Sequence, residues 1–104
     1  METELAYSNT NHCQIRDFIN NLPKDERAQV YAAFDHIEKL GLVGLETRHI
    51  YGKIWEFKTY RFNRLFYFIK TNDRMIIIYA MKKQKNKLEI KIRDKIISLY
   101  KRLK

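Results

Sequence analysis

The sequence has 104 residues, of which 45% are hydrophobic, with only 3 Gly and 1 Pro, and this composition favours one compact domain over a disordered chain. No apolar run approaches the ~18–20 residues of a membrane span, and the opening METELAYSNTNH lacks the basic and apolar regions of a secretory signal. The single cysteine, Cys13, excludes a disulfide within the chain and fits a reducing compartment, so a cytoplasmic protein is expected.

The net charge of +9 is concentrated in the second half of the chain. Residues 1–52 carry 5 Lys and Arg against 8 Asp and Glu, a net of −3, whereas residues 53–104 carry 16 against 4, a net of +12. Aromatic and β-branched residues gather in the same half, so the cations stand on a rigid apolar scaffold. Such a surface suits a polyanion, because neutralised phosphates are the general source of nucleic-acid affinity. On composition alone, a solvated Lys-rich face explains the charge equally well.

The first part of the chain predicts two helices. Asn11 can cap a short helix over about residues 12–21. Pro23 then opens a second helix, which Gly41 ends as a left-handed cap. The apolar stripe of this second helix repeats at three- and four-residue steps, at Val30, Phe34, Ile37 and Leu40. The short joint between the helices predicts an antiparallel hairpin.

After Gly44 the pattern changes to the two-residue period of strands. Strands are predicted over residues 53–59, 63–70 and 75–81, with a hairpin turn at 71–73. The last two strands are apolar on both faces, which predicts central strands covered on each side. Helical spacing then returns in an apolar stripe at Leu88, Ile92, Ile96, Leu99 and Leu103. This order of elements predicts an α+β domain.

Strand geometry decides which cations can act together. Lys58 shares a strand face with Glu56, so it can reach a groove while Trp55 and Phe57 fill the core on the opposite face. Arg64 begins the next strand and can hold a phosphate through a fork of two N–H groups.

Further lysines leave the end of the third predicted strand together, at Lys82, Lys83, Lys85 and Lys87. They meet Lys58 and Arg64 over one sheet surface if the strands are neighbours. Each of these residues taken alone is more readily explained as a solvated cation.

The sequence contains no Cys/His cluster, Gly-rich phosphate loop or Ser nucleophile motif, so neither a metal nor another cofactor is expected. RNA can supply its own nucleophile, the ribose 2′-hydroxyl. An enzyme then needs cations against the developing charge and groups that carry protons. A lysine among other cations has a lowered pKa and can move a proton. Tyr79 can stack a base or act as an acid, or simply pack at the strand end.

His49 is the one histidine retained as a candidate for RNA binding, because it immediately precedes the basic strands. Arg61, between the first two predicted strands, is a further candidate for RNA binding.

The run RHIYGKIWEFKTYRFNRLFYFIKTNDRMIIIYAMKKQKNK resembles the HigB branch of the RelE/ParE-type toxins, often described as phage-derived proteins. That branch shows a G-x-[IL]-W-E-[LF]-[RK] strand, an R-[IVL]-[FL]-Y-[FV] strand, and an apolar strand that ends in a basic turn. The opening CQIRDFINNLPKDERAQVYAAFDHIEKLG is similar to the helical hairpin of the family. The resemblance implies a RelE-like fold over residues 1–104, in which an N-terminal helical hairpin and a C-terminal helix pack on a small antiparallel β-sheet.

The resemblance also implies a toxin that cleaves messenger RNA, usually in the ribosomal A site. A cognate antitoxin, expected to be a small helix-turn-helix DNA-binding protein, would hold it inactive. Carried over residue by residue, the catalytic candidates are Lys58, Arg64, Lys82, Lys83 and Tyr79. The RNA-binding candidates are Lys85, Lys87, Arg61 and His49.

This chain departs from the family pattern at two places. Leu88-Glu89 replaces a Thr-Pro pair, and Tyr79 stands where many relatives have His. Two other functions stay open on the sequence alone: a non-catalytic, ParE-like toxin that poisons DNA gyrase, and a basic accessory protein that binds RNA or the ribosome.

Overall fold

The computed structural model describes residues 1–6, 12–83 and 88–103. Its elements in chain order are β1 (Glu2–Leu5), α1 (Gln14–Asn20), α2 (Lys24–Leu40), β2 (Thr47–Tyr51), β3 (Ile54–Thr59), β4 (Asn63–Thr71), β5 (Arg74–Lys82) and α3 (Ile90–Leu103). Within these ranges five strands and three helices form, so the predicted α+β class is confirmed. The predicted cap Asn11 and the lysines Lys85 and Lys87 lie outside the described residues.

The described strands form a single sheet in the order β1-β5-β4-β3-β2. The strand β1 runs parallel to β5, and the other neighbouring pairs are antiparallel. The three predicted strands correspond to β3, β4 and β5, whereas β1 and β2 were not predicted. In both edge strands polar side chains dominate and few residues are buried, so neither shows the apolar alternation that marks a strand in a sequence.

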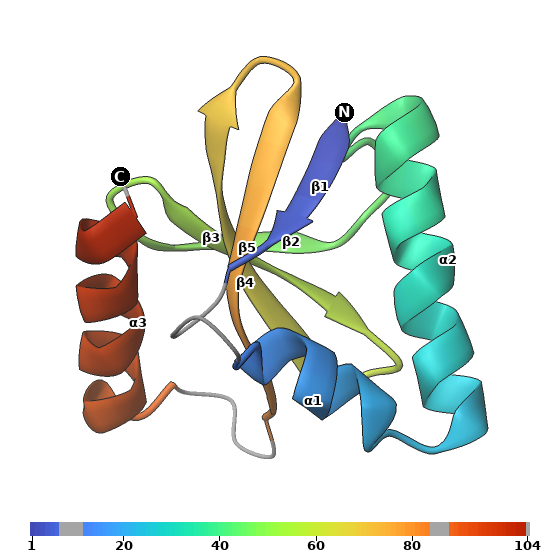
Figure 1. Ribbon diagram of the computed structural model, residues 1–104, viewed down its shortest axis with the longest axis horizontal. Helices are drawn as coiled ribbons and strands as arrows, with labels where there is room; N and C mark the ends of the chain where they lie inside the picture. The colour runs from blue at the N-terminus through green and yellow to red at the C-terminus, as the bar shows by residue number, and fades with distance from the viewer. Residues whose placement is uncertain (7–11, 84–87, 104) are drawn as a thin grey trace.

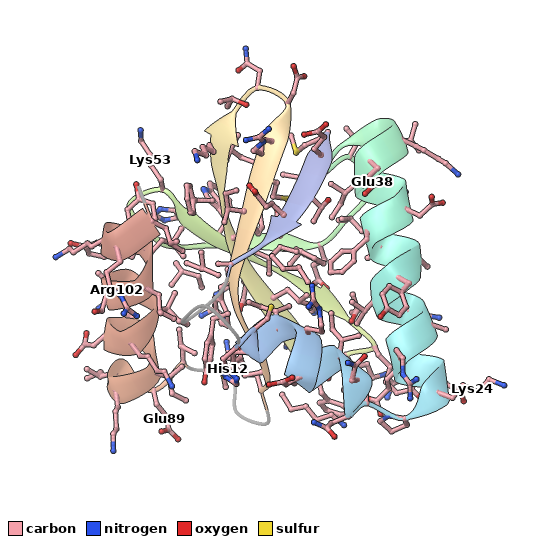
Figure 2. All side chains as sticks on the ribbon, in the orientation of Figure 1. His12, Lys24, Glu38, Lys53, Glu89 and Arg102 are labelled. Atoms are coloured by element: carbon pink, nitrogen blue, oxygen red, sulfur yellow. The ribbon has the colours of Figure 1, made fainter. Side chains whose placement is uncertain are left out.

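The sheet is covered by helices on both faces, with α3 on one side and α1 and α2 on the other (Figure 1). Side chains fill the space on both sides (Figure 2). Against α1 and α2 the strands place Phe57, Leu65, Tyr67, Met75 and Ile77. Against α3 they place Ile54, Phe66, Phe68, Ile76 and Ile78. The central strands β4 and β5 are therefore apolar on both faces, as predicted.

The helix α2 begins after Pro23 and ends before Gly41, whose positive φ of 72° favours glycine. The ψ of Gly41 is −151°, so the predicted left-handed cap does not form. Val30 and Ile37 are fully buried in its stripe. Leu40, predicted to belong to this stripe, is 65% exposed, because it is the last residue of the helix, where the chain turns away.

The predicted antiparallel hairpin of α1 and α2 does not form. Figure 1 shows α1 crossing the lower end of the sheet while α2 runs along its side. The short α1 is held at the sheet by Gln14, whose side-chain amide donates to the Ala80 carbonyl at 2.6 Å and accepts from the Ala80 N–H at 3.0 Å. Ala80 lies beyond the part of β5 that pairs with β1, so its backbone groups are available to Gln14. The two bonds set the direction of α1.

Two further predictions concern side chains at the sheet and in α3. Trp55, expected in the core, is 39% exposed, because it lies beside the edge strand β2, where its ring packs edge-on against His49. The helix α3 does pack through its predicted stripe, with Leu88 and Ile96 buried and the other members partly buried.

None of the helices formed by the described residues is long and apolar enough to cross a membrane.

A buried acidic residue ties α2 to the sheet. Glu26, in the first turn of α2, accepts a hydrogen bond from Asn63 Nδ2 at 3.0 Å and pairs with Lys82 Nζ at 3.1 Å. Asn63 and Lys82 are opposite each other on β4 and β5, so one carboxylate joins three elements. The hydrogen bond from Asn63 lowers the pKa of Glu26, and Lys82 lowers it further, against the opposing effect of burial.

This network predicts a loss of stability in acid. Because the pKa of Glu26 is lower in the folded protein than in the unfolded chain, its carboxylate stabilises the fold above the unfolded pKa, and this contribution is lost as pH falls through the folded pKa. We expect Glu26→Gln to lower the free energy of unfolding at neutral pH and to make little difference in strong acid, as measured by urea unfolding across the pH range.

The control for this prediction is Asp35→Asn, which removes an exposed pair with Lys39. It should change the free energy of unfolding by less than about 0.5 kcal/mol at any pH. Equal acid sensitivity of the parent protein and Glu26→Gln would contradict the prediction.

Candidate functional site

Strand pairing brings four charged residues onto one face of the sheet. Arg48 is opposite Glu56 across β2 and β3, and Lys58 is opposite Arg64 across β3 and β4. Directly paired residues share a face, and so do Glu56 and Lys58, which are two residues apart on one strand. Glu56 is also opposite Phe66, which packs in the core under α3, so the shared face is the one that α3 covers.

Lys83 joins this group from the end of β5. Its backbone N–H donates to the Phe62 carbonyl at 2.7 Å, which holds it beside the turn between β3 and β4. Its side chain is buried, at 5% exposure. The charges that act on it belong to the four residues of the same face. We call Arg48, Lys58, Arg64 and Lys83, gathered around Glu56, the cation cluster.

Glu56 provides the negative charge at the centre of the cation cluster. It is buried, and its Oε1 lies 3.8 Å from Arg48 Nε and 3.9 Å from Arg64 Nε. Its other oxygen, Oε2, is buried with no hydrogen-bond partner among the described residues. One carboxylate faces four cations, so the face keeps a positive charge toward a ligand. A second carboxylate, that of the exposed Glu46, pairs with Lys58 at the rim.

Arg64 is held in the cluster by two contacts. Its Nη1 donates to the Arg61 carbonyl while its Nε faces Glu56, and its side chain is only 14% exposed. A guanidinium is planar and carries five N–H donors. With two of its nitrogens held in this way, the guanidinium has little freedom to move.

The surroundings of Lys83 change its pKa. Burial lowers the pKa of Lys83, and the charges of Arg48, Arg64 and Lys58 lower it further, while Glu56 opposes them. The lowered pKa makes the neutral amine more accessible than in a surface lysine. The sequence indicated that neighbouring cations would have this effect, but burial contributes more.

The expectation that all these lysines meet on one face is wrong for Lys82. Lys82 is opposite Asn63 and extends to Glu26, on the face that α2 covers. Successive residues of a strand point to opposite faces, so the pair Lys82-Lys83 is divided between them.

His49 lies on the same face as Trp55, away from the cation cluster. It is opposite Trp55, with the two rings 5.0 Å apart, and its Nε2 is 2.7 Å from the Gly52 carbonyl.

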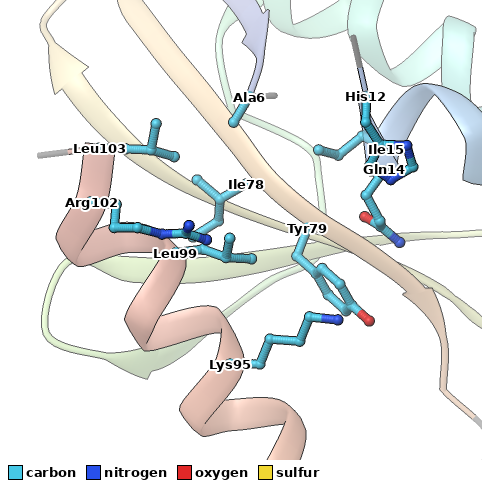
Figure 3. Close-up of a pocket in the computed structure, with 10 residues that line it drawn as sticks. All are labelled: Ala6, His12, Gln14, Ile15, Ile78, Tyr79, Lys95, Leu99, Arg102 and Leu103. Carbon is cyan, nitrogen blue, oxygen red and sulfur yellow. The ribbon is translucent and has the colours of Figure 1, made fainter. Parts of the chain in front are cut away.

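Tyr79 shares the face of the cation cluster but its contacts lie elsewhere. Its ring is 6.4 Å from that of Phe66, and Lys95 Nζ of α3 lies 5.3 Å from its centre. It lines a cavity of about 280 Å³ between α3 and the start of α1, and Figure 3 shows Lys95 reaching toward its ring there. The structure therefore does not bring Tyr79 to the cation cluster.

Arg61 is in the turn beside Arg64.

Sequence reasoning missed Arg48, because it did not predict β2. The signal was present in Gly52, whose φ of 54° turns the chain between β2 and β3. A regular hairpin at that glycine would pair Arg48 with Phe57, and the register shift between His49 and Tyr51 brings Arg48 opposite Glu56 instead, so the glycine signals β2 but not this pairing. No three His, Cys, Asp or Glu side chains of the described ranges gather closely enough to hold a metal ion.

The cation cluster predicts how Lys83 responds to its neighbours. Because Glu56 raises the pKa of Lys83 and Arg48 lowers it, Glu56→Gln should lower this pKa further and Arg48→Gln should raise it. The measurement is the titration of the Lys83 side chain by NMR in lysine-labelled protein.

Glu46→Gln is the matched control, since it removes a carboxylate that pairs with Lys58 instead. It should move the Lys83 titration less than Glu56→Gln does. A Lys83 signal that titrates together with the surface lysines would contradict the burial of this ammonium group.

The cation cluster lies within a region shared with known proteins. The family model described as Phage derived protein Gp49-like (DUF891) matches residues 17–101, a span that contains all five residues of the site. A search of curated proteins finds no match. The family match covers most of the chain and agrees with the RelE/ParE resemblance of the sequence. The chain belongs to the Gp49-like phage-derived family, a RelE/ParE-like family associated with the toxins of toxin–antitoxin systems.

Proposed function

We propose that this chain is the toxin of a type II toxin–antitoxin system, a HigB-like endoribonuclease that cleaves messenger RNA on the ribosome without a metal ion or other cofactor. Membership of a toxin-associated family supports the toxin part of the proposal. The observation that carries the nuclease part is the cation cluster, in which four cations from β2, β3, β4 and the end of β5 surround one buried carboxylate.

The reaction uses the nucleophile that RNA carries. The ribose 2′-oxygen forms a bond to the adjacent phosphorus while the bond to the 5′-oxygen of the next nucleotide breaks. The products are a 2′,3′-cyclic phosphate and a free 5′-hydroxyl. A base takes the proton from the 2′-hydroxyl, an acid gives one to the departing 5′-oxygen, and negative charge builds on the phosphoryl oxygens.

The cation cluster supplies what this reaction needs. Arg64 and Lys58, opposite each other on β4 and β3, hold the phosphate and oppose its growing charge. Lys83 is the proton carrier, because its lowered pKa allows the amine to accept the 2′ proton or the ammonium to donate to the 5′-oxygen. Glu56 orients Arg48 and Arg64 and acts as a positioning residue.

For the other candidate residues we propose no part in the cleavage step. Lys82 supports the fold through Glu26, and the contacts of His49 are on the far face of the sheet. Tyr79 stands near α3, so a role in proton transfer draws no support from its contacts. Lys85 and Lys87 remain proposed RNA-binding residues.

The proposed partners follow from the charge and the family. Translating ribosomes in the cytoplasm supply the messenger RNA. The antitoxin, proposed to be a small helix-turn-helix DNA-binding protein, inhibits by neutralising the +12 of residues 53–104 or by covering the cation cluster.

Loss of Arg64 tests the proposal. Arg64→Ala should abolish growth arrest on controlled expression, because removing one donor to the transition-state charge lowers the cleavage rate by about 100- to 1,000-fold. Mapping of RNA 5′ ends after induction should show fresh cuts within codons for the parent protein and none for the variant. The matched control is Lys70→Ala, which removes an exposed cation of the same strand and should leave toxicity intact.

The outcomes separate the three functions considered. Full toxicity of Arg64→Ala at equal expression would reject the site. DNA-damage signalling with intact messenger RNA would identify a gyrase-poisoning toxin. A protein that binds ribosomes in a salt-dependent way but is harmless when overproduced would be an accessory RNA-binding protein.

A further inference from the structure

We propose that the turn between β3 and β4, Tyr60-Arg61-Phe62, is a subsite that stacks nucleobases of single-stranded RNA next to the scissile phosphate. We call these three residues the aromatic tip. This inference rests on the proposed function, and it names how the RNA is held outside the cation cluster. In Figure 1 the turn lies at the lower right, near the beginning of α2.

The aromatic tip exposes two large rings. Tyr60 is 49% and Phe62 is 48% exposed, with the exposed Arg61 between them. Exposed aromatic rings beside cations are how proteins hold single-stranded nucleic acid, because every base offers a face for stacking. The tip thus has the composition of a stacking platform.

The backbone of the aromatic tip is fixed by hydrogen bonds. The Phe62 N–H donates to the Tyr60 carbonyl at 2.7 Å. Tyr60 and Arg61 have φ of 51° and 68°, values that side-chain-bearing residues adopt only when the surroundings hold them there. The rings therefore stand on a turn with little freedom, which reduces the entropy lost when a ligand binds.

Two members of the cation cluster hold the aromatic tip directly. Arg64 Nη1 donates to the carbonyl of Arg61, and the Lys83 N–H donates to the carbonyl of Phe62 at 2.7 Å. The tip and the cluster are thus joined by hydrogen bonds through the residues proposed to bind phosphate and carry protons. An RNA strand whose phosphate lies at Arg64 passes the tip with its neighbouring bases.

Charge favours RNA as the occupant over an apolar protein partner. The aromatic tip adjoins a face where four cations surround one buried carboxylate, and Arg61 adds a further cation at the tip itself. A polyanion with exposed bases matches both features, whereas duplex RNA keeps its base faces stacked inside.

The test is RNA binding by the full chain. The probe is a fluorescent single-stranded oligonucleotide of mixed sequence with 2′-O-methyl riboses, which cannot be cut because the nucleophile is blocked. Tyr60→Ala and Phe62→Ala should each weaken binding by about 5- to 100-fold. Tyr60→Phe and Phe62→Tyr keep a ring and should bind like the parent protein. Tyr31→Ala, which removes a ring of 51% exposure from α2, is the matched control and should change nothing.

Salt dependence separates stacking from damage to the site. Stacking neutralises no phosphate, so the aromatic-tip variants should keep the parent's slope of log affinity against log salt, while Arg64→Ala should reduce this slope by about 0.7. A collapsed turn would release Arg64 and Lys83 from their carbonyl partners and reduce the slope as well. A reduced slope in the alanine tip variants would therefore overturn stacking as the cause.

An abasic oligonucleotide completes the test. With the bases removed, the parent protein and the alanine tip variants should bind equally. Tip variants that bind the normal oligonucleotide as tightly as the parent would overturn the stacking subsite and leave the proposed nuclease intact, and a tip that serves a protein partner would give this result. A parent protein that does not bind the oligonucleotide at any salt concentration would also overturn the stacking subsite, whereas the proposed nuclease is rejected only by the Arg64→Ala experiment.

Discussion

The site depends on one buried carboxylate. Four cations on neighbouring strands repel one another, and burying a cation without a counter-charge is costly. Glu56 offsets this repulsion from within the sheet, where Arg48 and Arg64 both face its Oε1 and where it opposes the lowering of the pKa of Lys83. Glu56, together with the exposed Glu46 that pairs with Lys58, does not neutralise the four cations. The arrangement that lowers the energetic cost of clustering these cations in the free protein therefore leaves a net positive charge that can bind a phosphate.

The two faces of the sheet carry different groups of charged residues. On the face of α2, Glu26 binds Asn63 and Lys82, and this network connects the beginning of β4 with the end of β5. On the face of α3, the next residues along both strands, Arg64 and Lys83, belong to the cation cluster. Residues of the Glu26 network and residues of the proposed site thus alternate along the chain, so the network on one face holds the strand ends that carry the proposed site on the other.

Several features of the fold could be predicted from the sequence because their signals are local. The apolar runs of β4 and β5 showed buried central strands, and Pro23 and Gly41 marked the ends of α2. The edge strands β1 and β2 were not predicted because none of their residues is fully buried, so they lack a clear apolar pattern and depend mainly on pairing with their neighbours. The direction of α1 depends on the bonds from Gln14 to Ala80, a residue 66 positions away, and no local pattern records it.

The types of the main elements, the concentration of charge in the second half, and the shared face of Glu56 and Lys58 could be predicted from the sequence alone, since each follows from composition or from the period of a single strand. Which cations meet depends on the folded chain. The register of β2 against β3 brought Arg48 to Glu56, and strand alternation sent Lys82 to Glu26 and left Lys83 buried in the cluster. These outcomes depend on pairing between distant segments, and the burial that shifts the pKa of Lys83 exists only once those segments have packed.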